Sequence, residues 1–60
     1  MNKIKCLREK LGFSQMELAA KMNVSQQSIA KWENGSNMPR SDKLPELAKA
    51  LKCEVSDLFE

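Results

Sequence analysis

Two helix start signals follow one another closely in the middle of the sequence, and they constrain the fold more than any other feature. Ser14 precedes Glu17 by three residues. This is the spacing of a capping box, so we expect a helix that begins at Gln15. Ser25 is a second start signal soon afterwards. The helix from Gln15 must therefore be short, and only a tight turn separates it from the next helix.

The turn between these two helices is centred on Asn23. After Gly, Asn is the residue that best tolerates the left-handed conformation needed to leave a helix abruptly. The second helix is expected to run from its Ser25 cap to about Glu33, before Asn34 and Gly35. Residues 15–33 therefore predict a helix-turn-helix, whose second helix projects from the domain and fits a DNA major groove about 12 Å wide.

The apolar residues of this segment fit the same geometry. Ile29 and Trp32 are three residues apart, so they share the inner face of the second helix. We assign Trp32 to the core rather than to stacking on a nucleic-acid base. Ala19 is small enough for the two helices to cross there.

The flanking segments carry three further helical patterns. The apolar positions of the two longer ones are Ile4, Leu7 and Leu11, and then Leu44, Leu47, Ala48 and Leu51. Gly12 ends the first pattern, and Pro45 falls in the first turn of the second, where a missing N–H costs little. Ser56 is expected to cap a short C-terminal turn that contains Leu58 and Phe59. No segment alternates as a strand does, so the sequence predicts one all-α domain, residues 1–60, of four or five short helices.

The composition argues against several classes of function. The chain has 60 residues, no His and two Cys, Cys6 and Cys53, that lie far apart. We therefore expect no metal and no cofactor. An enzyme is excluded because there is no Cys with a nearby base and no Gly-rich phosphate loop, and no small-molecule ligand is evident. No stretch is apolar enough for a membrane span and Met1–Lys10 is not signal-like, so we expect a cytoplasmic protein with reduced thiols.

Charge is distributed unevenly along the chain. Residues 1–43 contain eight Lys or Arg and four acidic residues, a net +4, whereas residues 44–60 contain two and four, a net −2. The overall charge of +2 hides this difference. An anionic partner is therefore expected at the first 43 residues.

The motifs resemble those of the Cro and phage-repressor family of helix-turn-helix proteins, also called the XRE family, over essentially the whole chain. They are SQMELA at 14–19, VSQQSI at 24–29, WENG at 32–35 and LPELAKAL at 44–51. The resemblance implies a compact lambda-repressor-like domain and a transcriptional regulator, most simply a repressor. It also implies binding of double-stranded operator DNA as a homodimer, with the dimer contact around Leu58 and Phe59.

The same resemblance nominates the residues that contact DNA. Those expected at base edges are Gln26, Gln27 and Lys31, and those expected at phosphates are Ser14, Gln15, Ser25, Ser28, Asn34 and Arg40. The chemistry agrees, because a Gln amide offers one donor and one acceptor and matches adenine N7 and N6. The amides at the two helix N-termini add partial positive charge near the phosphates.

The resemblance further suggests an ion pair between Arg8 and Glu33. Such a pair would hold the second helix of the motif against the first helix of the chain. An exposed pair of little energetic value is the alternative.

Two other binding functions compete with duplex DNA. A small helical protein-interaction module, such as an antitoxin-like partner-binding domain, would use the same exposed helix. The polar surface of Gln26 and Gln27 argues against it, because a peptide groove exposes apolar anchors. Duplex RNA is disfavoured because its major groove is too narrow for a helix.

Overall fold

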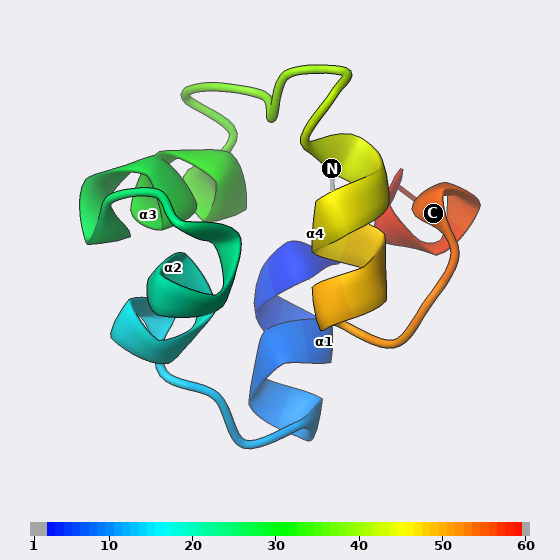
Figure 1. Ribbon diagram of the computed structural model, residues 1–60, viewed down its shortest axis with the longest axis horizontal. Helices are drawn as coiled ribbons and strands as arrows, with labels where there is room; N and C mark the ends of the chain where they lie inside the picture. Colours follow the sequence, from blue (N-terminus) through cyan, green and yellow to red (C-terminus); the bar gives the residue numbers. More distant parts are fainter. Residues whose placement is uncertain (1–2, 60) are drawn as a thin grey trace.

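The computed structural model describes residues 3–59, which form four α-helices and one 3-10 helix (Figure 1). The helices are α1 (Ile4–Lys10), α2 (Gln15–Met22), α3 (Gln26–Asn34), α4 (Leu44–Ala50) and the 3-10 helix η1 (Val55–Phe59). The described residues contain no strand. The predicted all-α fold is therefore confirmed.

The start of α2 is the predicted capping box. Ser14 Oγ accepts a hydrogen bond from the Glu17 amide at 3.0 Å, and Glu17 Oε1 accepts one from the Ser14 amide at 2.7 Å. The helix ends at Asn23, which has a left-handed φ of 56°. The amide of Val24 then donates to the carbonyl of Ala19 at 3.0 Å, so the turn is closed by the backbone itself.

The next helix also begins and ends on local signals. Ser25 Oγ accepts from the Ser28 amide at 3.1 Å, which caps the first turn of α3. Its last residue is Asn34, one position beyond the prediction, and Gly35 follows with a φ of 83°. Pro45 lies in the first turn of α4, as expected.

The C-terminal prediction was wrong in two respects. Ser56 lies inside η1 and does not cap it; instead Asp57 Oδ2 accepts from the Glu54 amide at 2.9 Å. The helix begins at Val55, so Ser56 lies past the capping position, and the Asp57 carboxylate reaches back to the residue before the helix. Leu58 is fully buried, and its carbonyl accepts from the Lys3 amide at 2.7 Å. The Leu58 side chain therefore belongs to the core of this chain and is not available for the expected dimer contact.

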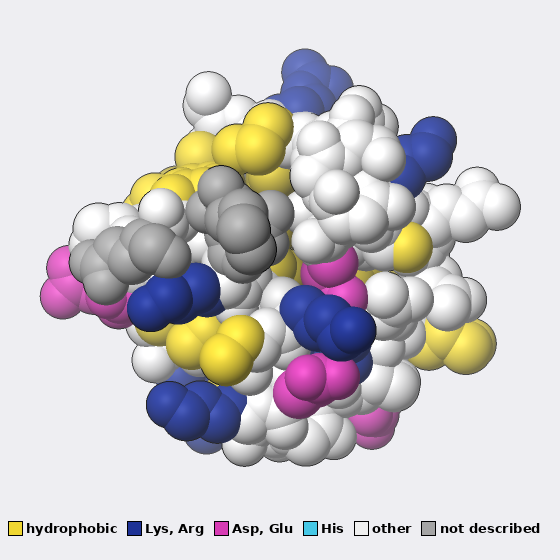
Figure 2. Space-filling model, turned by 180° about the vertical axis from the view of Figure 1, so that it is seen from behind, with side chains coloured by type: hydrophobic (Ala, Val, Ile, Leu, Met, Phe, Trp, Pro, Cys, Tyr) yellow, Lys and Arg dark blue, Asp and Glu magenta, His cyan; other side chains and the backbone are white. Residues whose placement is uncertain are grey.

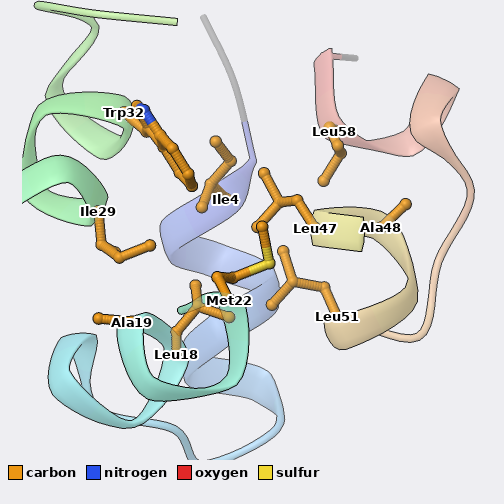
Figure 3. Packing of buried hydrophobic residues seen from close by; sticks show 10 residues of the cluster. All are labelled: Ile4, Leu18, Ala19, Met22, Ile29, Trp32, Leu47, Ala48, Leu51 and Leu58. Carbon is orange, nitrogen blue, oxygen red and sulfur yellow. The ribbon is translucent and has the colours of Figure 1, made fainter. Parts of the chain in front are cut away.

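The core lies where all five elements meet (Figure 3). Its buried apolar residues are Ile4, Leu18, Ala19, Met22, Ile29, Trp32, Leu47, Ala48, Leu51 and Leu58. Trp32 is only 6% exposed, which confirms its assignment to the core. With Ile29 and Trp32 packed inward, the opposite face of α3 is left for other contacts.

Candidate nucleic-acid interface

The outer face of α3 is polar and open. Gln26, Gln27 and Lys31 are all exposed, while Ile29 and Trp32 from the same helix are buried. The helix is thus held from one side only. The three side chains predicted to contact bases share this exposed face.

Arg8 of α1 fixes the far end of α3. Its Nε donates to Glu33 Oε2 at 2.6 Å and its Nη2 to Glu33 Oε1 at 3.2 Å, while its Nη1 donates to the carbonyl of Phe13 at 2.7 Å. The Arg8 and Glu33 side chains are 9% and 5% exposed. The hydrogen bond to Glu33 raises the pKa of Arg8 above its ordinary value, against the opposing effect of burial. The suggested ion pair is therefore present, and it is a buried, bidentate one.

The ion pair continues into the first residues of α2 and α3. Gln15 Nε2 donates to Glu33 Oε1 at 3.0 Å, and Gln26 Nε2 donates to Gln15 Oε1 at 3.3 Å. We call this series of hydrogen bonds, from Arg8 through Glu33 and Gln15 to Gln26, the Arg8–Gln26 network. It links α1 to the residue predicted to contact a base. Because Gln15 and Gln26 are hydrogen-bonded, the N-termini of α2 and α3 lie close together.

The predicted phosphate contacts fall into two groups. The hydroxyls of Ser14 and Ser25 cap their helices, and the Ser28 hydroxyl lies 3.0 Å from that of Ser25. These serines are already engaged within the chain. Their positions matter because the first N–H groups of a helix lack partners inside it and attract anions.

The other group carries exposed side-chain donors. Asn34 is exposed, and its Oδ1 accepts from the Ser36 amide at 2.8 Å, so the acceptor end of this side chain is engaged within the chain. The Arg40 side chain is 88% exposed in the loop between α3 and α4, 4.0 Å from Asp42. Asn34 and Gln15 line one surface hollow together with Lys5. Lys5 was missed by the sequence analysis, because no local pattern shows that α1 borders the N-terminus of α2 here.

On the face of the molecule seen in Figure 2, the basic side chains do not form one continuous patch. Lys and Arg lie there at separate positions, with acidic and hydrophobic side chains between them. On this face, separate cations rather than a continuous basic patch would attract a polyanion.

Comparison with known proteins identifies the family to which this chain belongs. The helix-turn-helix family matches residues 4–58. The chain belongs to this helix-turn-helix family. It is 33% identical over 58 residues to the uncharacterized HTH-type transcriptional regulator YgzD of Bacillus subtilis (strain 168), covering 97% of this chain and 88% of that protein. It is also 43% identical over 37 residues to the 26 kDa repressor protein of Escherichia phage HK022, covering 62% of this chain but 16% of the repressor.

Membership of the helix-turn-helix family confirms the predicted resemblance and supports DNA-binding transcriptional regulation as the class of function of this chain. Within residues 3–59, no group of three or more His, Cys, Asp or Glu side chains is arranged to hold a metal ion. None of the helices in the described part of the chain has the length and apolar character needed to cross a bilayer.

Proposed function

We propose that this helix-turn-helix domain is a repressor that binds operator DNA as a symmetric homodimer, with α3 in the major groove of each half-site. The observation that carries the proposal is Gln26, an exposed amide at the start of α3 that the Arg8–Gln26 network holds in one place. A side chain ordered before binding loses less conformational entropy when it meets a base.

The exposed face of α3 contacts the bases and selects among them. Gln26 contacts adenine through N7 and N6, a match worth about 1–3 kcal/mol of discrimination. Gln27 lies beside it, and Lys31 follows about one turn later, within reach of guanine O6 and N7 or of a phosphate.

Phosphates are held by the flanks of the motif. The N-termini of α2 and α3, capped by Ser14 and Ser25, approach the backbone of the duplex. Asn34 and Arg40 add side-chain donors beyond the end of α3, and Lys5 adds a charge beside Gln15. These contacts set the position of α3 but carry no sequence information.

A dimer follows from the small size of one half-site. A single short helix contacts only about four or five base pairs, so two copies spaced about 34–36 Å apart supply the missing affinity. With Leu58 buried, we place the dimer contact on the exposed part of the C-terminal segment. Val55 is 37% exposed there, and Phe59 is half-buried.

The experiment is selection of bound sequences from a randomised duplex library at two salt concentrations. We expect an enriched inverted repeat, with affinity that falls steeply as salt rises. Gln26→Ala should relax one position in each half-site, whereas Arg40→Ala should weaken all sequences alike. Salt-sensitive binding without any enriched motif would contradict sequence-specific recognition and point to a protein partner instead.

A further inference from the structure

We propose that Glu33 is a positioning residue for base selection, although it touches no base itself. Its carboxylate fixes the direction in which Gln15, and then Gln26, present their amide groups. This direction makes α3 prefer adenine to guanine at the base that Gln26 contacts. The inference rests on the proposed function, because it requires Gln26 to meet a base edge.

The orientation of the Gln15 amide is set by groups that can only donate or only accept hydrogen bonds. The Arg8 guanidinium can only donate and the Glu33 carboxylate can only accept. Glu33 Oε1 lies 3.0 Å from Gln15 Nε2. Gln15 must therefore turn its NH₂ group toward Glu33 and its carbonyl oxygen away from it.

The orientation of the Gln15 amide in turn fixes the orientation of the Gln26 amide. Gln15 Oε1 accepts from Gln26 Nε2 at 3.3 Å. Gln26 thus uses one N–H inside the protein and keeps one N–H and its carbonyl oxygen for DNA. Adenine offers the matching pair, an acceptor at N7 and a donor at N6, whereas guanine offers acceptors at both N7 and O6. With guanine, the Gln26 oxygen would face O6 with no hydrogen between them.

Burial keeps water from competing for the hydrogen bonds that orient the Gln15 amide. The side chains of Arg8 and Glu33 are 9% and 5% exposed, and Gln15 is half-buried. Only Gln26, at the end of the series, is exposed. The hydrogen bonds that set the orientation of the Gln26 amide therefore lie mostly inside the protein, and only the Gln26 side chain at the end of the series is exposed.

The decisive variant is Glu33→Gln. The new amide turns its oxygen to Arg8 Nε, the closer of the two Arg8 donors, and its NH₂ group to Gln15, so that the longer contact with Arg8 Nη2 is lost. The Gln15 amide then turns over, so that its oxygen accepts from position 33 and its NH₂ group donates to Gln26. The Gln26 amide turns over in response, so that its oxygen accepts from Gln15 and both of its N–H groups face the base. The adenine-over-guanine preference of the wild type, about 5- to 150-fold for a two-bond match, should fall to about onefold or invert.

The matched control is the double variant Glu33→Gln with Gln15→Glu, which keeps the net charge. The carboxylate at position 15 accepts from both neighbours, so Gln26 again shows one N–H and its oxygen. Its preference for adenine should return to within about threefold of wild type. Overall affinity stays lower because the carboxylate faces phosphates, but the ratio between the two bases is unaffected by a uniform loss.

Competition binding to two duplexes that differ at this base pair gives the ratios, with folding of each variant checked by Trp32 fluorescence. A Glu33→Gln variant that binds more weakly but keeps the wild-type ratio would show Glu33 to be merely structural and would overturn the inference. A wild type without base preference would instead overturn the proposed function.

A measurement on the unmodified chain covers the case in which Glu33→Gln does not fold. In nuclear magnetic resonance spectra, the Gln15 NH₂ protons should show through-space contacts to Glu33. Contacts from the Gln15 NH₂ protons to Gln26 in place of Glu33 would refute the assigned direction.

Discussion

Replacing Arg8 with Met removes the charge of the buried ion pair while keeping most of the side-chain volume. Glu33 would then be left 5% exposed without its cation, and the carbonyl of Phe13 would lose its donor. Breaking a buried pair from one side costs about 3–5 kcal/mol. A 60-residue domain has about 3–9 kcal/mol of stability in total. Arg8→Met should therefore bring the domain close to its unfolding threshold at 25 °C.

Urea denaturation followed by fluorescence measures this cost directly, because Trp32 is the one Trp in the chain and is 6% exposed. The matched control is Arg8→Met with Glu33→Leu, which leaves no unpaired charge. Replacing both partners of a buried pair is often neutral or stabilising, so the double variant should recover most of the loss. An Arg8→Met variant destabilised by less than about 1 kcal/mol would show that the pair behaves as an exposed one.

Three further predictions concern local features. Ser14→Ala should lower the free energy of unfolding by about 1 kcal/mol through loss of the α2 cap, as measured by thermal melting; an unchanged Tm would contradict the role of this cap. Lys52 has a φ of 56°, so Lys52→Gly should stabilise the domain by up to about 1 kcal/mol in urea titrations, and a loss of stability would show that its side chain outweighs the backbone strain. Burial and the charge of Asp57 raise the pKa of the Cys53 thiol, which lowers its thiolate fraction at a given pH. The exposed Cys6 should therefore be alkylated first by iodoacetamide near pH 8, with Cys53 catching up as the pH rises; equal rates by mass spectrometry would contradict this order.

The sequence was most informative where structure is decided within a few residues. A capping box at Ser14 and a left-handed turn at Asn23 depend on side chains and amides that are close in the chain. The helix-turn-helix followed from them. The prediction for Ser56 failed because η1 begins one residue earlier, at Val55, where the Asp57 carboxylate accepts from the Glu54 amide.

Contacts between distant segments were predicted only where the family resemblance supplied them. The resemblance suggested an ion pair between Arg8 and Glu33. No sequence pattern indicated that Gln15 would lie between Glu33 and Gln26. Nor did the sequence show that Leu58 lies in the core while its carbonyl accepts from the Lys3 amide. The first arrangement depends on how α2 packs against α3 and the second on how α1 and η1 meet, which periodicity alone does not fix.

The hydrogen bond between the Lys3 amide and the Leu58 carbonyl brings the two ends of the described chain together. Figure 1 shows η1 and α3 at opposite sides of the molecule, whereas the N-terminal end adjoins Ile4, which lies beside Trp32 of α3 in Figure 3. A linker that leaves from the η1 side could therefore join one copy to a second in tandem, starting away from the exposed face of α3. Such a covalently tethered pair would turn the second binding event into an intramolecular one, and half-site spacing could then be tested independently of protein concentration.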